Sequence, residues 1–407
     1  MTQTIPSEGT GDTRWGIAVL AILAGVIAAT QIGKVPPSMS VLGAEFAVGM
    51  VALGWIASIF NATGALLGLP FGALSDGFGH RKVLIISLWT IAAGSLLGAF
   101  TDNYTMLFLT RILEGIGYLG VIVAAPSLIV EATNPRDFGL ALGLWSSFLP
   151  FGFATMMVTS PWFLETIGWQ GLWLFNAAIL AVFALIFTIA TRDLSTLPNR
   201  QEEPPTLRLG QAFGVARLAG PWLLVLALMA YTLQWFGLNA WMPTFFAGTL
   251  GYTLGGAASL SALVVFANGP GAVFGSWLLH RGWANWFLTV LGCGFMGVIG
   301  FLVFSDFVAD GAKFWLALAF SFLGGLLPPA IISAVPTESP SRSHIGAVNG
   351  FVMQGNNFGY MMGAPIFAFA IERTGTWESA AWLLLALGVF GVAVGFILRR
   401  HEARRLG

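Results

Sequence analysis

The sequence predicts an all-α membrane protein of twelve transmembrane helices, arranged as two pseudo-symmetric halves of six helices each. Three observations predict this fold class: a very low content of charge, a series of long apolar runs, and an internal repeat. The chain has 407 residues, of which 57% are hydrophobic and only 9% are charged. Soluble domains carry about 25% charged residues. So little charge cannot cover a water-exposed surface, so we expect the chain to lie in a bilayer.

The apolar runs are long enough to be membrane spans. Crossing the hydrocarbon core takes about 20 apolar residues in an α-helix. Residues 1–13 are polar and lack a basic segment, so we expect the first run to be a retained helix and not a signal peptide. The expected helices are 15–42, 50–75, 83–101, 105–130, 139–161, 170–191, 219–246, 257–279, 285–304, 313–335, 345–371 and 379–398.

Lysines and arginines are concentrated in alternate connections between these helices. Of the 18 in the chain, fourteen fall on the side of the two termini, and only Lys313 and Arg373 fall on the other side. The remaining two, Lys34 and Arg111, lie inside predicted helices. Because cytoplasmic loops carry the excess of positive charge, both termini are expected in the cytoplasm. The predicted location is the plasma membrane, which in a bacterium is the inner membrane.

An internal repeat relates the two halves at one offset. The stretch Asn61-Ala-Thr-Gly-Ala-Leu-Leu-Gly68 matches Asn268-Gly-Pro-Gly-Ala-Val-Phe-Gly275, with four identities displaced by 207 positions (268 − 61). We therefore expect a first half at 1–191, a polar cytoplasmic linker at 192–217 and a second half at 218–407. This plan is common in transporters with a central binding site. The same offset relates Trp15 to Trp222, Pro36 to Pro243, Glu131 to Glu338 and Gly143 to Gly350.

Several function classes lack the residues that they need. Cys293 is the single cysteine, and the four histidines fall in predicted loops or in the tail, which argues against disulfides, metal sites and haem. No catalytic cluster lies at membrane depth, and no phosphate-binding loop for ATP is present. We expect no enzyme activity, no cofactor, no metal and no nucleic-acid partner. A receptor or scaffold stays open, although the repeat and the intramembrane charges argue against it.

Two motifs resemble those of a known family. The stretch Gly72-Ala-Leu-Ser-Asp-Gly-Phe-Gly-His-Arg-Lys82 is a charged, glycine-rich hinge between two apolar runs. It resembles the loop between helices two and three of the major facilitator superfamily. Arg111-Ile-Leu-Glu-Gly-Ile-Gly117 is similar to the Arg-x-x-Gln/Glu-Gly-x-Gly motif in helix four of that family. The resemblance covers essentially the full chain and implies the fold described above.

The resemblance also implies a gate at the hinge. Asp76 is expected to bridge to Arg136, or to lie at the start of helix eleven near Gly346, where an anion is favoured. Such contacts would hold the cytoplasmic side shut, and Asp76→Asn should slow transport while leaving binding nearly intact. Alternatively, the basic residues of the hinge only set topology. The second-half counterpart, around Arg281, has lost most of the pattern. The implied gating residues are Gly72, Asp76, Gly79, Arg81 and Arg136.

Two further likenesses bear on the substrate. Gly33-Lys-Val-Pro-Pro37 and Trp241-Met-Pro243 resemble the cyanate and nitroimidazole transporter branch of the family, which has Arg-Pro in helix one. Helix five has Pro150 and Gly152 but not the full Gly-Pro motif associated with antiporters. This absence weakens an efflux interpretation.

Lys34 is the sharpest candidate for a binding residue. A lysine at membrane depth costs about 2.5–3.5 kcal/mol on insertion scales, so it needs a compensating role. Pro36 and Pro37 follow it and loosen the local hydrogen-bond ladder because they lack N–H groups. We expect Lys34 to face a cavity and bind an anion. The alternative is a lysine that extends to the outer headgroups.

Arg111 and Glu114 lie one turn apart in helix four, and Tyr118 lies one turn further on the same face. They form either a structural ion pair or a coupling unit in which Arg111 meets the substrate and Glu114 takes a proton. Burial disfavours the charged form of Glu114 and the adjacent arginine favours it, which leaves both roles open. Together with Lys34 they leave one net positive charge, which favours an anionic substrate.

The remaining candidates are uncharged and lie in both halves. Each is a possible ligand, although polar side chains in hydrocarbon also hydrogen-bond between helices. Trp241 occupies the position equivalent to Lys34 and is expected on the opposite wall. These candidates are Gln31, Asn61, Gln234, Trp241, Asn268, Gln354 and Asn357.

These observations predict a monomeric secondary carrier that moves a small organic or inorganic anion of the carboxylate type by alternating access, with protons as a possible coupling ion. The alternative is proton-driven efflux of a drug or metabolite, with Glu114 as the proton site. The partners are thus a small molecule, protons and the lipid bilayer.

Overall fold

The computed structural model describes residues 13–68, 78–192, 214–341 and 344–406, and within these ranges it contains helices and no strand. The prediction of an all-α fold is confirmed. Among the described residues, eleven segments are long and apolar enough to cross a membrane. The predicted span 345–371 corresponds to α16, which has 30 residues and is long enough to cross but is more polar. The helix count is therefore consistent with the twelve predicted.

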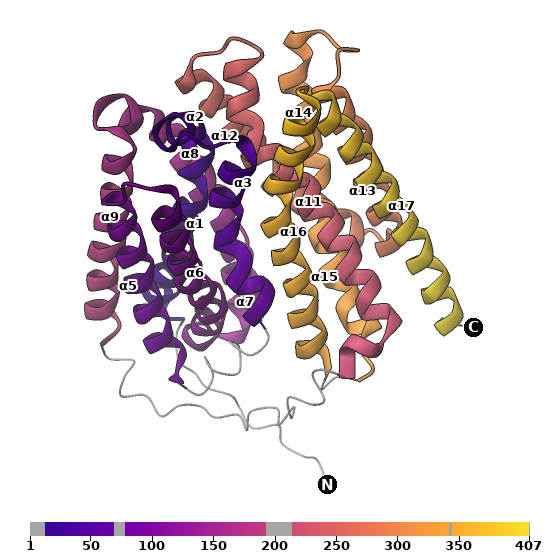
Figure 1. Cartoon of the computed structure of the whole chain (residues 1–407). Coiled ribbons are helices and arrows are strands. Elements are labelled where there is room, and N and C mark those ends of the chain that lie inside the picture. The colour runs from indigo at the N-terminus through magenta and orange to yellow at the C-terminus, as the bar shows by residue number, and fades with distance from the viewer. Residues whose placement is uncertain (1–12, 69–77, 193–213, 342–343, 407) are drawn as a thin grey trace.

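The helices fall into two groups that lie side by side (Figure 1). The first group holds the helices up to residue 190, and the second holds those from residue 219. The limits predicted for the two halves stay a prediction, because residues 193–213 of the linker lie outside the described part. The elements of the first group are α1 (Trp15–Gly33), α2 (Val35–Phe46), α3 (Met50–Ser58), η1 (Ile59–Asn61), α5 (His80–Ala99), α6 (Tyr104–Ala132), η2 (Pro135–Asp137), α7 (Phe138–Trp145), α8 (Phe148–Thr166) and α9 (Gly168–Ala190).

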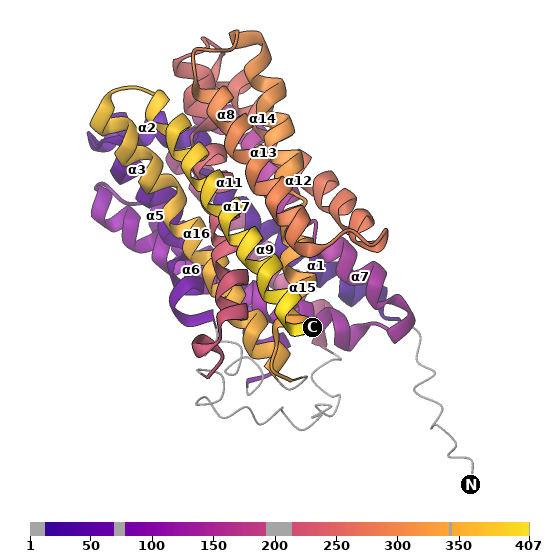
Figure 2. The ribbon, with the colours of Figure 1, turned by 90° about the vertical axis from the view of Figure 1, so that its right-hand side faces the viewer.

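The second group begins with a short 3-10 turn and continues with seven helices. Seen from its side, α17, α11 and α16 lie next to one another along the molecule (Figure 2). Its elements are η4 (Val215–Arg217), α11 (Ala219–Gly248), α12 (Leu254–His280), α13 (Asn285–Phe304), α14 (Asp310–Gly324), α15 (Leu327–Glu338), α16 (Ile345–Thr374) and α17 (Glu378–Leu406).

Two predicted spans are broken where a pair of prolines follows. Lys34 separates α1 from α2, which has Pro36 and Pro37 in its first turn. Leu326 precedes α15, which likewise has Pro328 and Pro329 in its first turn. Proline is tolerated at the start of a helix but removes a hydrogen bond from its interior. The expected weakening of the ladder near Lys34 is therefore seen as a one-residue interruption, in which Lys34 keeps helical dihedral angles and Trp15–Phe46 still forms one span.

The repeat is visible in the backbone as well. Gly168 starts α9 and Gly375 precedes α17; the two are 207 positions apart (375 − 168), and both have φ of 73°. A positive φ of this size favours glycine, because other residues pay a steric cost there. The two halves thus enter their last helices through the same left-handed residue.

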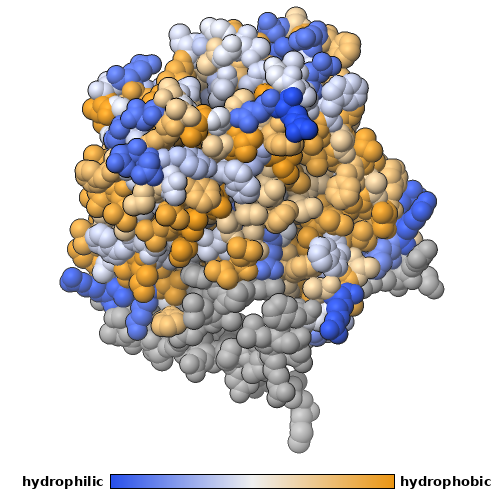
Figure 3. Space-filling model, viewed as in Figure 1, coloured by the Kyte–Doolittle hydropathy of each residue, from blue (hydrophilic) through white to orange (hydrophobic). Residues whose placement is uncertain are grey.

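The halves meet along three helix pairs: α3 with α16, α8 with α12, and α2 with α11. A Cβ atom at Gly54 would lie 3.0 Å from the carbonyl oxygen of Ala364, so α3 and α16 approach closely. Across α8 and α12, the rings of Phe151 and Phe266 are 5.4 Å apart at their centroids. On the outside, hydrophobic side chains form a broad band with hydrophilic ones toward its ends (Figure 3). This pattern fits a multi-pass membrane protein.

Candidate functional site

Lys34 lies at the break between α1 and α2 and is completely buried, with an exposed fraction of 0%. Its backbone N–H still donates to the carbonyl of Thr30 and so ends α1. The ammonium group points into the first half instead of toward the headgroups. The structure therefore does not support the alternative in which this lysine extends to the membrane surface.

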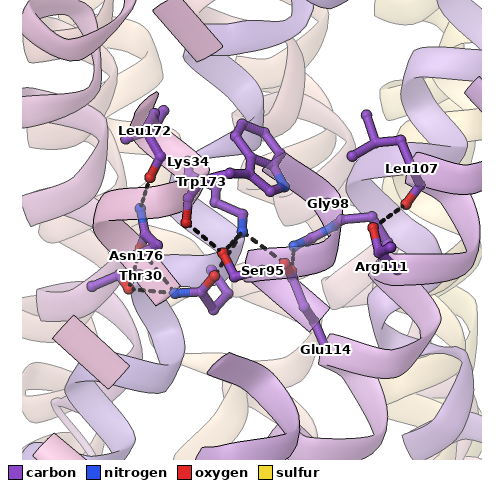
Figure 4. Close-up of polar contacts among 12 residues, drawn as sticks. Thr30, Lys34, Ser95, Gly98, Leu107, Arg111, Glu114, Leu172, Trp173 and Asn176 are labelled. Atoms are coloured by element: carbon purple, nitrogen blue, oxygen red, sulfur yellow. Dashed lines mark hydrogen bonds and ion pairs between the residues drawn. The ribbon is translucent and has the colours of Figure 1, made fainter. Parts of the chain in front are cut away.

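The ammonium group is held by three hydrogen bonds from three different elements. Nζ of Lys34 donates to Gln31 Oε1 at 2.7 Å, to Ser95 Oγ on α5 at 2.9 Å and to Glu114 Oε1 on α6 at 2.8 Å. It also lies 4.4 Å from the ring centroid of Trp173 on α9. An ammonium has three donors, so all of them are used. Figure 4 shows Ser95 and Glu114 beside the ammonium group of Lys34.

Glu114 joins this lysine to Arg111. Its second oxygen, Oε2, accepts a hydrogen bond from Nη1 of Arg111, and both side chains are fully buried. Nε of Arg111 donates to the carbonyl of Ile56 on α3 at 3.2 Å. The guanidinium carbon lies 4.7 Å from the ring centroid of Phe60. Arg111 and Glu114 are thus in contact, with Lys34 as a third member of the cluster, and the choice between a structural and a coupling role stays a prediction.

One nitrogen of the Arg111 guanidinium has no hydrogen-bond partner among the described residues. This nitrogen, Nη2, is buried. A buried donor without a partner costs about 1–3 kcal/mol, and more when it is charged. Two cations also share one carboxylate here, so the cluster of Lys34, Arg111 and Glu114 carries one surplus positive charge. The cluster thus combines a buried donor that has no partner with two cations that share one carboxylate.

A second layer of polar side chains holds Gln31 in place. Its Nε2 donates to Asn176 Oδ1 at 2.8 Å, and Nδ2 of Asn176 donates to the carbonyl of Leu172 at 2.9 Å. Ser95 in turn donates to the carbonyl of Trp173 at 2.9 Å. These contacts fix the side chains around Lys34 to α9. They also leave the donors of Lys34 no choice of partner within this arrangement.

Sequence reasoning missed Ser95, Trp173 and Asn176. Asn176 and Ser95 are isolated polar residues within apolar runs, which is the signal that selected Asn61 and Asn268. That signal does not say which of two faces of a helix they occupy, so it could not connect them with Lys34.

Glycines bring the helices of the site together. A Cβ at Gly94 of α5 would lie 2.8 Å from Cγ of Glu114. A Cβ at Gly115 would clash with the carbonyl oxygen of Phe60. Phe60 in turn packs between Arg111 and Tyr118, whose ring centroid is 4.7 Å away. The first glycine of the helix-four motif therefore serves the close approach of α6 to η1.

Four other uncharged candidates, three in the second half and Asn61 in the first, form hydrogen bonds outside this cluster. Gln234 and Trp241 are buried and donate to the carbonyls of Ala230 and Ala364. Asn268 accepts from the hydroxyl of Tyr231 at 3.1 Å and donates to a backbone carbonyl. Asn61 reaches only the carbonyl of Ser58, at 3.5 Å.

Two candidates on α16 face the first half. Gly64 lies against the side chain of Asn357, and Gly68 lies against that of Gln354. The amide of Asn357 also donates to the carbonyl of Met353. These two side chains therefore lie at the contact between the halves.

The hinge is described only in part, because Gly72 and Asp76 lie outside the described residues. Gly79 has φ of 86° and precedes α5, so this position favours glycine. Arg81 donates to the hydroxyl of Thr191 at 2.9 Å and to the carbonyl of Thr188 at 3.0 Å, which ties α5 to the end of α9. The side chain of Arg136 is 69% exposed and lies 3.6 Å from Asp137. The gating roles stay a prediction.

The chain was compared with known proteins. Residues 21–351 match the model of the Major Facilitator Superfamily. A protein of Cupriavidus necator named as a probable sulfoacetate transporter, SauU, is 25% identical over 85% of this chain and 84% of its own length. A protein of Bacillus subtilis named as a niacin/nicotinamide transporter, NiaP, is 23% identical over 80% of this chain and 84% of its own.

Resistance proteins match over a shorter part. The methylenomycin A resistance protein of Bacillus subtilis is 30% identical, but over 47% of this chain and 41% of its own length. Among solved structures, a bacterial homolog of the human lysosomal transporter Spinster superposes with a TM-score of 0.79 at 16% identity, covering 97% of this chain and 99% of its own. This last likeness shows the fold.

Proposed function

Because this chain belongs to the Major Facilitator Superfamily, we propose that it is a secondary carrier for a small organic anion of the carboxylate type, working by alternating access. In this proposal the carrier is a monomer in the bacterial inner membrane with both termini in the cytoplasm. The observation that carries the proposal is the surplus cation of the buried cluster formed by Lys34, Arg111 and Glu114.

The charge balance of the cluster supports an anionic substrate. A charge taken out of water costs several kcal/mol unless it is paired and hydrogen-bonded. Glu114 can neutralise only one of its two cationic neighbours. A substrate carboxylate that reached Nη2 of Arg111 would satisfy the unpartnered donor and cancel the second charge. Carboxylates suit this role because guanidinium and carboxylate match in geometry.

The same balance supports coupling to a proton. When Glu114 takes a proton on a carboxylate oxygen, both Lys34 and Arg111 lose their counterion and the cluster carries two positive charges. The electrostatic free energy of binding an anion to the cluster is then more favourable. Loss of that proton restores both ion pairs and weakens the hold on the anion. Proton and anion would therefore travel together, which is symport.

The uncharged candidates have supporting roles in this proposal. Gln31 positions Lys34, and Tyr118 packs against Phe60 beside the guanidinium. Gln354 and Asn357 lie where the halves meet, so they are placed to contact a substrate between the halves. Asn61, Gln234, Trp241 and Asn268 are proposed to complete the path, although each already has a partner in this structure.

Thermal stability of the purified protein tests the binding role of Lys34. Sulfoacetate, nicotinate and acetate are the probes, since the first two are named for relatives of this chain. A ligand present at a free concentration of 100 times its Kd stabilises the folded state by about 2.7 kcal/mol. We expect at least one probe to raise the Tm of the wild type, and Lys34→Gln to abolish this rise.

Two further variants control for folding. Lys34→Arg keeps the charge and should retain a weakened response. Lys313→Gln removes the other buried lysine, which pairs with Asp310 at 3.0 Å in the second half, and should respond like the wild type. A probe that stabilised Lys34→Gln as much as the wild type would rule out the binding role.

Efflux is the second candidate, and it is favoured by the match to the methylenomycin A resistance protein, which covers 47% of this chain. An exported lipophilic cation would be repelled by the surplus charge of the cluster. Tetraphenylphosphonium in the same thermal assay separates the two candidates. Stabilisation by this cation, with no response to any anion, would favour efflux.

A further inference from the structure

A cavity of about 490 Å³ lies between the beginning of α11 and the end of α17. The two helices run side by side in the second half (Figure 2). Since both cross the membrane, their ends lie at the level of the lipid headgroups. The cavity is far along the chain from Lys34, Arg111 and Glu114 and has no part in the proposed transport site. Its lining residues are Ala219, Trp222, Leu223, Ile397, Arg400 and His401.

One wall of the cavity is apolar and open to the surroundings. Leu223 is buried, whereas Trp222 is 44% exposed and Ile397 is 51% exposed. The indole N–H of Trp222 donates to the carbonyl of Ala216, so its ring is held in place. Tryptophan is enriched at membrane interfaces, where its apolar ring meets acyl chains and its N–H meets polar groups. This wall is suited to contact the part of an acyl chain that lies next to the headgroup.

The other wall is basic. Arg400 is exposed and forms no hydrogen bond or ion pair that the described part of the chain provides. Its neighbour Arg399 is engaged elsewhere, with its guanidinium carbon 4.7 Å from the ring centroid of Trp286. His401 faces inward, and its Nδ1 lies 3.2 Å from Oε2 of the buried Glu338. Arg400 is therefore the cation that the cavity presents to a ligand.

We propose that this cavity binds an anionic phospholipid, with the phosphate on Arg400 and the upper acyl chain against Trp222, Leu223 and Ile397. Basic pockets between transmembrane helices are suited to acidic headgroups. A soluble anion would make no use of the apolar wall, and a neutral lipid would make no use of the free charge. Because the apolar wall and Arg400 lie next to each other at the depth of the headgroups, the cavity favours a lipid that carries a negative charge.

Native mass spectrometry of the purified full-length protein tests this assignment with two lipids, phosphatidylglycerol and phosphatidylcholine. The wild type should retain phosphatidylglycerol in preference. Arg400→Gln should weaken phosphatidylglycerol binding about fivefold, the effect of one basic residue at the headgroup level, and leave phosphatidylcholine unchanged. Arg399→Gln is the matched control and should keep the wild-type preference, because that side chain stacks on Trp286.

A second variant addresses the apolar wall. Ile397→Ala removes most of the apolar contact that this side chain would make with acyl chains, and because the position is 51% exposed the variant should fold normally and bind both lipids more weakly. Equal retention of phosphatidylglycerol by the wild type and Arg400→Gln would overturn the proposal. Displacement of the lipid by inorganic phosphate would also overturn it, since the ligand would then be a free anion.

Discussion

The first half of the molecule buries an ion cluster where the second half, at equivalent positions, has uncharged side chains. At the offset of 207, Lys34 corresponds to Trp241 and Glu114 corresponds to Ser321. Trp241 donates to the carbonyl of Ala364 at 3.0 Å, and Ser321 accepts from Trp235 Nε1 at 3.0 Å. Equivalent positions thus keep a hydrogen-bonding role in both halves, but only the first half adds charge.

This difference is one of chemistry, because close helix packing at glycine occurs in both halves, although at positions that the offset of 207 does not relate. Gly115 lies against the carbonyl oxygen of Phe60 in the first half, and Gly271 lies against that of Phe322 in the second. Close helix contacts therefore occur in both halves. The ion cluster occurs in one half, so we expect substitutions there to affect transport, and substitutions of packing glycines to affect stability in both halves.

The largest effect is expected for Glu114→Gln. This change leaves Lys34 and Arg111 buried with no anion, and breaking a buried pair costs about 3–5 kcal/mol. We expect a large fall in Tm and loss of proton-dependent anion uptake in proteoliposomes.

The equivalent change in the second half is Ser321→Ala, which removes one acceptor. It should cost about 0.5–1.5 kcal/mol and leave uptake within a factor of three. Equal losses in the two variants would show that the halves do not differ as described.

An intermediate effect is expected for Gly115→Ala and Gly271→Ala. Each adds a methyl group against a backbone carbonyl, and overpacking of this kind costs about 1–3 kcal/mol. Thermal unfolding should show similar falls in Tm for the two variants. A fall confined to one half would contradict the shared packing.

The smallest effect is expected at the hinge. Arg81→Gln removes two hydrogen bonds between a part-buried side chain and the end of α9, and because water can replace them the cost should be about 0.5–1 kcal/mol. Arg281, near the corresponding place in the second half, stacks on Trp277 of its own helix with the guanidinium carbon 4.7 Å from the ring centroid.

Arg281→Gln should therefore stay within about 0.5 kcal/mol of the wild type, as exposed substitutions usually do. Chemical unfolding of both variants measures the difference. A larger loss for Arg281→Gln would mean that the degenerate hinge still holds the second half together.

Much of the fold follows from the sequence because the bilayer restricts the options. In hydrocarbon, each backbone polar group must be satisfied within the segment, so an apolar run of about 20 residues becomes a helix. The predicted ends that fall on described residues lie within five residues of the observed ones, except that α17 runs to Leu406 where the prediction ended at 398. The offset of 207 reappears at Gly168 and Gly375. The predicted weakening of the helix near Lys34 is seen as a one-residue interruption between α1 and α2.

The candidate site was predictable in part. Lys34, Arg111 and Glu114 stand out in the sequence because charge inside the membrane is costly. The spacing of Arg111 and Glu114 in one helix also predicted their pairing. Their link to Lys34 joins positions 80 residues apart (114 − 34), and no local pattern records such a contact.

The sequence by itself determined that this is a helical membrane protein of two related halves with charge in the first. Only the tertiary structure decided that Lys34 points into the first half, that Ser95 and Asn176 surround it, and that Nη2 of Arg111 has no partner within the described residues. The physical reason is that apolarity and helix period act on neighbouring residues. The pairing of charges depends on which helices pack together, and in lipid that packing is set by close contacts such as those of Gly94 and Gly115.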